Sequence, residues 1–204
     1  MSSSVDVLDI ASQLFYQEGI QHVGMDRIRD ATGVSLKALY RQFGSKEGLI
    51  EAYLLRRDER WLGWLAEHIR TQSVPRARLL AIFDALDEWF HGADFAGCAF
   101  IRAYAESPEG SAAQIAAANH KERLAALVRG EALAYDPARG EELAEQLLLL
   151  IEGAMVRAHV GRQPHAARTA KAAAAVLIEP WARDRQRPAT TDEPTGRPGS
   201  REES

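Results

Sequence analysis

The sequence predicts an all-α protein of about nine helices. Its 204 residues are rich in alanine, leucine, glutamate and arginine, which favour helices, and runs of β-branched residues are scarce. Apolar residues recur at the spacing of three and four that gathers them on one helix face, as Leu8, Ala11 and Phe15 do. Short segments containing glycine, proline or serine separate these periodic stretches. We expect three short helices, followed by a C-terminal helical bundle.

The three short helices are predicted at residues 6–17, 24–32 and 35–43. Ser35 can cap the third of them by accepting a hydrogen bond from an unpaired backbone N–H. A tight turn at Gly33 joins the second helix to the third, which presents long polar side chains. Two short helices in this arrangement define a helix-turn-helix.

The other six helices would form the bundle, and proline marks two of their boundaries. Pro75 suits a first helical turn, where its missing N–H costs nothing. Pro180 should end or kink the last helix, because proline lacks the donor and clashes with the preceding turn. The expected ranges are 46–70, 75–90, 95–106, 111–134, 136–161 and 164–180.

This pattern divides the chain into three parts. Residues 1–48 would form the helix-turn-helix domain, extending into the start of the fourth helix. Residues 49–183 would form a ligand-binding and dimerisation domain. Residues 184–204 are predicted to be a disordered tail, because their composition buries too little apolar surface to offset the entropy of ordering.

The composition limits which cellular compartments and which binding partners fit this chain. The single cysteine, Cys98, cannot form an intrachain disulfide, which fits a reducing cytoplasm. No apolar run reaches the ~20 residues of a membrane span, and the first residues lack the features of a signal peptide. The net charge of −4 argues against wholesale coating of nucleic acid but permits a local basic face.

Residues 33–46 form such a basic segment. They contain Lys37, Arg41 and Lys46 and no acidic residue. Lysine and arginine neutralise DNA phosphates, while arginine, lysine and glutamine also pair with base edges in the major groove. The alternative is an ordinary helical hairpin with a solvated basic face.

The helix-turn-helix hypothesis gives each polar side chain a role. We assign mixed base and backbone contacts to Lys37, Arg41 and Gln42. Leu36 could meet a thymine methyl group. Lys46, at the start of the fourth helix, should bind phosphate with help from that helix's N-terminus.

A spaced pattern over roughly residues 5–53 supports this hypothesis. It resembles the N-terminal DNA-binding domain of the TetR family of one-component repressors. The resemblance implies that the Tyr40 hydroxyl contacts a phosphate. The pattern consists of Leu8, Ala11, Leu14, Phe15, Gly19, Ile28, Gly33-Val34-Ser35, Leu39-Tyr40, Phe43 and Ser45-Lys46. The predicted DNA-contacting residues are Arg27, Ser35, Leu36, Lys37, Tyr40, Arg41, Gln42 and Lys46, and Arg27 is equally well explained as a plain surface charge.

Two departures from the family pattern affect the contacts. Val23 and Gly24 stand where the family usually has two small hydroxyl residues, so Gly24 can cap the second helix but offers no side-chain contact. Lys37 stands where the family favours a small residue or proline, and it could add a contact to guanine or phosphate.

Aromatic residues of the C-terminal region suggest a pocket between the fourth to seventh helices for a hydrophobic or planar molecule. Plain core packing is the alternative for each of them. Cys98, His120 and His159 are better explained as structural or surface residues than as redox or metal sites, and the sequence predicts no metal or cofactor. The candidate pocket residues are Trp61, Trp64, Phe83, Trp89, Phe90 and Tyr104.

The last two long helices indicate a homodimer. The eighth is apolar around much of its circumference, and the alanine-rich ninth permits close helix approach. A four-helix interface would place two recognition helices on a palindrome, each DNA turn being ~34 Å.

We therefore expect a transcriptional repressor that a small hydrophobic ligand releases from a palindromic operator, through a fourth helix that links the two sites. One alternative is an activator of the same family. Another is a helical ligand carrier or enzyme with a vestigial helix-turn-helix, although no catalytic motif supports an enzyme.

Overall fold

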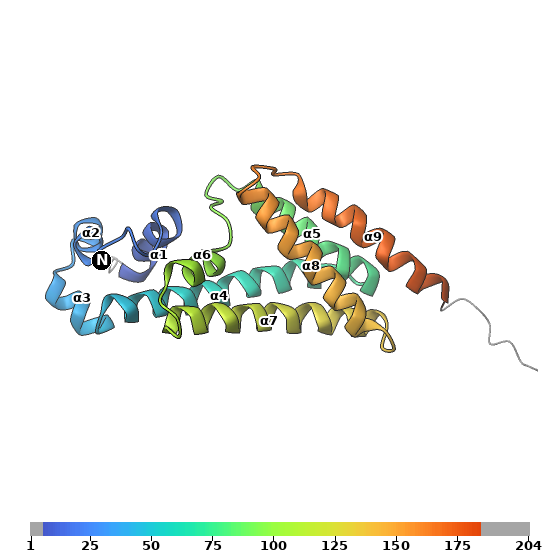
Figure 1. The fold of residues 1–204 in the computed structure, drawn as a ribbon, viewed down its shortest axis with the longest axis horizontal. Helices are drawn as coiled ribbons and strands as arrows, with labels where there is room; N and C mark the ends of the chain where they lie inside the picture. The colour runs from blue at the N-terminus through green and yellow to red at the C-terminus, as the bar shows by residue number, and fades with distance from the viewer. Residues whose placement is uncertain (1–5, 185–204) are drawn as a thin grey trace, which may run out of the picture.

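The computed structural model describes residues 6–184, and these residues form nine α-helices and no strand (Figure 1). The predicted all-α class is confirmed. Residues 1–5 and the predicted tail, apart from Asp184, lie outside the described residues. The helices are α1 (Val7–Glu18), α2 (Met25–Thr32), α3 (Leu36–Phe43), α4 (Lys46–Arg70), α5 (Pro75–Phe90), α6 (Ala99–Glu106), α7 (Ala112–Tyr135), α8 (Gly140–His159) and α9 (Ala166–Asp184).

Two helices begin later than the sequence predicted, and side-chain hydrogen bonds account for both delays. Helix α6 starts at Ala99 because the Tyr16 hydroxyl holds the backbone of Ala96 and Gly97 in a loop. Helix α8 starts at Gly140 because the Asp136 carboxylate accepts hydrogen bonds from the backbone N–H groups of Ala138 and Arg139 and forms a turn.

The prediction that Pro180 ends the last helix is wrong, because helix α9 continues through this proline to Asp184. A kink at Pro180, the other predicted outcome, stays a prediction. A proline inside a helix costs about 3 kcal/mol locally. Helix α9 packs along α5 and α8, and these tertiary contacts offset the local penalty.

Helix α4 connects the two halves of the molecule. Its 25 residues extend over about 37 Å at the helical rise of 1.5 Å per residue. Its first turns pack against α1 and α3, and its later turns pack against α5 and α7. Figure 1 shows α1, α2 and α3 at one end of the molecule and α5, α8 and α9 at the other, with α4 and α7 running side by side between them.

Candidate nucleic-acid interface and adjoining cavity

The turn between α2 and α3 is fixed by local hydrogen bonds. Gly33 adopts the left-handed conformation at φ 71°, and its N–H caps α2 on the Arg29 carbonyl. The Thr32 hydroxyl accepts a hydrogen bond from the Val34 N–H at 3.2 Å. Ser35 caps α3 by accepting from the Ala38 N–H at 3.3 Å, as predicted. These contacts set the angle at which α3 leaves the domain.

Helix α3 exposes its polar side chains because its apolar side chains are packed in the core of the domain. Leu39 is completely buried, together with Ile28 of α2 and Leu49 of α4. On the opposite side Lys37, Arg41 and Gln42 are exposed, and 46% of Tyr40 is accessible.

The cations of α3 are available to a partner. Within the described part of the chain, neither Lys37 nor Arg41 forms an ion pair. Leu36, one position before Lys37, is half-buried against the core. The arrangement offers unneutralised positive charge beside groups that can hydrogen-bond, which is the chemistry that binds a nucleic-acid groove.

The other predicted contact residues flank α3 in different ways. Lys46 is half-buried at the start of α4 and donates from Nζ to the Gln21 carbonyl at 3.5 Å. Arg27 on α2 is exposed but forms a salt bridge with Glu18 at 3.1 Å. Lys46 therefore sits at a helix N-terminus suited to phosphate, whereas Arg27 already has an anionic partner.

Gly24 caps α2 through its backbone alone. Its carbonyl accepts from the Ile28 N–H at 3.2 Å, and there is no side-chain cap. Val23 is fully buried. Both residues therefore serve the fold, and neither supplies the side-chain hydroxyl that the family pattern has here.

The N-terminal domain is also fastened to the bundle away from α4. The Tyr16 hydroxyl of α1 donates to the Gly97 carbonyl and accepts from the Ala96 N–H, both at 3.0 Å. Arg102 of α6 donates to the Tyr16 carbonyl at 2.7 Å. Sequence reasoning missed this connection and assigned the link between domains to α4 alone.

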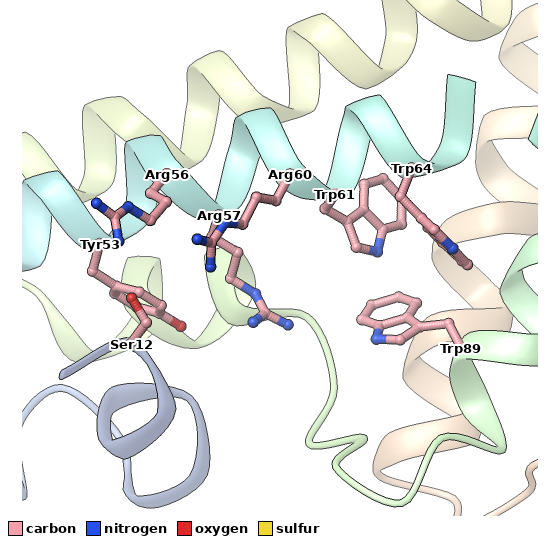
Figure 2. A pocket seen from close by; sticks show the side chains of 8 residues that line it. All are labelled: Ser12, Tyr53, Arg56, Arg57, Arg60, Trp61, Trp64 and Trp89. Atoms are coloured by element: carbon pink, nitrogen blue, oxygen red, sulfur yellow. The ribbon is translucent and has the colours of Figure 1, made fainter. Parts of the chain in front are cut away.

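A cavity of about 230 Å³ lies where α1, α4 and α5 meet (Figure 2). Its walls combine three tryptophans with three arginines. The spacing of 57, 61 and 64 places Arg57 on the same face of α4 as the predicted Trp61 and Trp64. That spacing could have revealed the arginine from sequence. The lining residues are Ser12, Tyr53, Arg56, Arg57, Arg60, Trp61, Trp64 and Trp89.

The structure brings together only three of the six predicted pocket residues. Trp61, Trp64 and Trp89 line the cavity. Phe83 is completely buried and Phe90 nearly so, and both pack in the core instead. Tyr104 is more than half exposed and borders a separate groove between α6 and α7. The predicted single pocket spanning α4 to α7 is therefore corrected to a cavity formed by α1, α4 and α5.

The remaining candidate residues are packed or paired. Cys98 is buried just before α6. The His159 ring lies edge-on to Phe95. His120 is buried, stacks on Phe100 at a centroid distance of 3.6 Å and hydrogen-bonds to Asp58.

One group of potential metal ligands occurs among the described residues. Donor atoms of Asp87, His91 and His165 lie within 4.8 Å of one another. The Arg168 side chain already pairs with both Asp87 carboxylate oxygens, at 3.1 and 3.0 Å. A cation would have to compete with that guanidinium.

Helices α8 and α9 expose an apolar face. Leu149 of α8 and Val160, which follows the last residue of α8, are each 75% accessible, and Val176 of α9 is 67% accessible. A side chain added at Gly153, between Leu149 and Val160, would meet nothing within 4 Å. This face is open to a packing partner.

These features define a class of protein. An exposed basic helix in a helix-turn-helix domain, followed by a helical bundle with a cavity at the junction, is the architecture of a DNA-binding regulator. Residues 7–53 match the family described as bacterial regulatory proteins, tetR family. The N-terminal domain is therefore similar to the DNA-binding domain of the tetR family, and the fold of the described residues is that of TetR-family regulators.

Curated relatives match the N-terminal part. The chain is 37% identical over 79 residues to the HTH-type transcriptional activator FasR of Mycolicibacterium smegmatis, covering 39% of this chain and 36% of that one. It is 38% identical over 74 residues to an HTH-type transcriptional regulator of Mycobacterium tuberculosis, covering 36% and 37%. The matches thus span little more than a third of these relatives.

Solved structures resemble the whole fold. A TetR-family transcriptional regulator of Streptomyces coelicolor superposes with a TM-score of 0.80 at 26% identity, covering 85% of this chain and 87% of that one. A TetR regulator of Streptomyces avermitilis superposes with a TM-score of 0.71 at 28% identity, covering 85% and 98%. Among the described residues, no helix combines the length and hydrophobicity needed to cross a membrane.

Proposed function

We propose that the chain represses transcription by binding a palindromic operator as a homodimer, and that a small ligand in the α1–α4–α5 cavity releases it. The observation that carries the DNA-binding part is the exposed face of α3. Lys37 and Arg41 have no ion-pair partner among the described residues, and Leu39 anchors the helix from below. Unpaired cations on a rigid helix attract phosphate and can read guanine.

The individual contacts follow from position. Lys37, Arg41 and Gln42 would reach base edges and backbone, with Leu36 against a thymine methyl group. Tyr40, Ser35 and Lys46 would hold phosphates, as groups at helix ends and exposed hydroxyls do. Arg27 would contribute only by leaving Glu18, and we rank it last.

The dimer would form through the apolar face of α8 and α9. Leu149 of α8, Val160 just after α8 and Val176 of α9 expose hydrophobic surface here. Gly153 leaves room for a helix to approach closely. An isologous interface of this kind would fix the separation between the two α3 helices and so select the half-site spacing.

Ligand release would work through the position of the cavity. Ser12 belongs to the N-terminal domain and Trp89 to the bundle, and both line the same space. A ligand that fits best when α1 has shifted relative to α4 would favour a conformation with wrongly spaced recognition helices. Ligand and operator would then oppose each other reciprocally.

The test is a mobility-shift titration against DNA fragments from upstream of the gene and its neighbours. We expect a specific shifted complex that Arg41→Ala weakens. If no fragment is bound more tightly than random DNA of the same length, the vestigial helix-turn-helix alternative is correct. FasR is named an activator, so a transcription assay on the bound fragment is needed to distinguish repression from activation.

A further inference from the structure

We propose that the cavity between α1, α4 and α5 binds an aromatic anion, whose acidic group pairs with Arg57 and whose ring packs against the tryptophans. This inference rests on the proposed function only in assigning the cavity to an effector. It adds the chemical class of that effector and the residue that would select it.

The charge of Arg57 is the first argument. Its guanidinium carbon lies 3.6 Å from the centroid of the Tyr16 ring, so the side chain is positioned by a cation–π contact. Its neighbours are already neutralised, because Arg56 pairs with Asp6 and Asp9 at 2.7 and 3.0 Å and Arg60 pairs with Asp9 at 2.8 Å.

Arg57 itself forms no ion pair with any carboxylate in the described part of the chain. It is only half-buried, and Figure 2 shows its guanidinium in the space between Tyr53 and the tryptophans. A planar guanidinium held in place without a counter-ion favours a carboxylate or sulfonate, which it can bind through two hydrogen bonds.

A buried indole nitrogen is the second and independent argument. Nε1 of Trp61 is shielded from solvent and has no hydrogen-bond partner. Buried indole N–H groups usually find an acceptor, since leaving one unpaired costs free energy. Trp61 lines the cavity, and in Figure 2 its nitrogen lies on the side of the ring that faces Trp89. An acceptor atom on the ligand would satisfy it after a small rotation of a tryptophan ring that now shields it.

The walls account for the aromatic part of the ligand. The ring centroids of Trp61 and Trp89 are 5.4 Å apart with the planes inclined at 65°, and the Trp64 ring centroid is 6.2 Å from that of Trp61. Indole faces bind flat rings by stacked and edge-on contacts. The volume of about 230 Å³ suits a molecule of two or three rings.

A neighbouring cleft indicates which way round the aromatic anion would bind. A second, wider cleft of about 570 Å³ shares Ser12, Arg57 and Arg60 with the cavity and extends to Asp94. The Asp94 carboxylate would repel an acidic group. The acidic end should therefore lie at Arg57, and the ring should lie toward the tryptophans.

The experiment uses two probes that differ by one charged group. 1-Anilinonaphthalene-8-sulfonate and the neutral N-phenyl-1-naphthylamine share the same ring system, and their fluorescence reports binding to the purified full-length protein. We expect Arg57→Gln to weaken binding of the sulfonate about tenfold or more, because a hydrogen bond to a charged group is lost. Binding of the neutral probe should change less than twofold. Trp61→Phe should also weaken the sulfonate.

The matched control is Arg70→Gln on the same helix, since Arg70 pairs with Glu67 and neither residue lines the cavity. It should leave both probes unaffected. Circular dichroism and melting curves establish that each variant is folded. The proposal is overturned if Arg57→Gln weakens both probes equally, or neither, in a folded protein.

No DNA is present in this assay, so its failure is separable from failure of the proposed function. Specific operator binding together with unchanged sulfonate affinity in Arg57→Gln would refute only the anionic ligand. If the sulfonate binds in an Arg57-dependent way but no specific DNA complex forms, the proposed regulatory function is refuted and the proposed anion site is supported.

Discussion

Nδ1 of His120 on α7 lies 2.6 Å from Oδ1 of Asp58 on α4. Both side chains are buried, and Arg123 pairs with the other Asp58 oxygen. The His120 ring also stands edge-on to Trp61 at 5.5 Å. This polar contact therefore joins α4 to α7 directly behind a wall of the cavity.

His120 should remain neutral across the physiological pH range. Burial lowers the pKa of its imidazole from 6.5 to about 3, and the Lys121 cation contributes in the same direction. The neutral ring then donates from Nδ1–H to Asp58. We expect ¹⁵N NMR to show no titration of this ring between pH 5 and 8. A titration midpoint near or above 6.5 would contradict the prediction.

The lowered pKa of His120 determines how the free energy of unfolding changes with pH. The unfolded chain binds a proton near pH 6.5 that the folded protein rejects until about pH 3. The contribution to stability is thus complete above pH 6.5 and is lost as the pH falls toward 3. In urea unfolding, the wild type should lose more stability between pH 7 and 5 than His120→Gln, which keeps a hydrogen-bond donor without the titration.

Arg41→Ala and Lys46→Ala should weaken operator binding in different ways. Arg41 is proposed to read a base, so its loss should cost about 1–3 kcal/mol and relax specificity at one position. Lys46 is proposed to bind a phosphate, so its loss should weaken all sequences equally. It should also reduce the slope of log K against log salt by about 1. Mobility-shift titrations at several salt concentrations measure both effects.

Lys171→Ala provides the control for removal of a cation. Its ammonium pairs with Asp84 on the bundle, at 2.5 and 2.7 Å, away from α3. Affinity and salt slope should both stay at the wild-type values. Unchanged binding in Arg41→Ala and Lys46→Ala would remove α3 from the interface.

Gly48→Ala should destabilise the N-terminal domain, whereas Gly63→Ala in the same helix should not. A Cβ at position 48 would overlap the backbone carbonyl of Phe43, which cannot move aside without disturbing the turn from α3 to α4. We expect a loss of about 1–3 kcal/mol in the free energy of unfolding. Position 63 has nothing within 4 Å of an added Cβ, so alanine should stabilise by about 0.5–1 kcal/mol there. Equal melting temperatures for the two variants would refute the steric argument.

Glutamate at both Leu149 and Val160 should separate the proposed dimer. Two charges on each face would have to be buried in the interface, where they find no partner. Light scattering after size exclusion should then report half the wild-type mass. Val74→Glu changes a comparably exposed valine outside α8 and α9, and it should leave the mass unchanged. A wild-type protein that already elutes as a monomer would contradict the dimer itself.

The sequence was a good guide wherever the determinants are local. The cap at Ser35 lies where predicted, because it needs only a backbone N–H three residues ahead, and Ser45 and Ser111 cap α4 and α7 in the same way. The exposed face of α3 also followed from helical periodicity. These features depend on neighbours within a single turn.

Features that depend on distant contacts were harder to predict. Phe83 and Trp89 both belong to apolar faces of α5, yet only Trp89 lines the cavity, because the packing of other helices decides which ring is covered. The loop before α6 is set by Tyr16, about 80 residues earlier in the chain. Periodicity within one segment carries no information about such partners.

The Tyr16 connection has a consequence for engineering this protein. If the N-terminal helices are exchanged with those of another regulator at a junction at the start of α4, the two hydrogen bonds of the Tyr16 hydroxyl depend on the residue that the new domain brings. A tyrosine at that position must still meet Gly97 and Ala96 of the old bundle, whereas Arg102 binds the backbone carbonyl that any residue keeps. If the proposed release by a ligand is correct, chimeras that keep this tyrosine with its bundle partners should respond to that ligand, whereas chimeras without it should bind DNA but no longer be released.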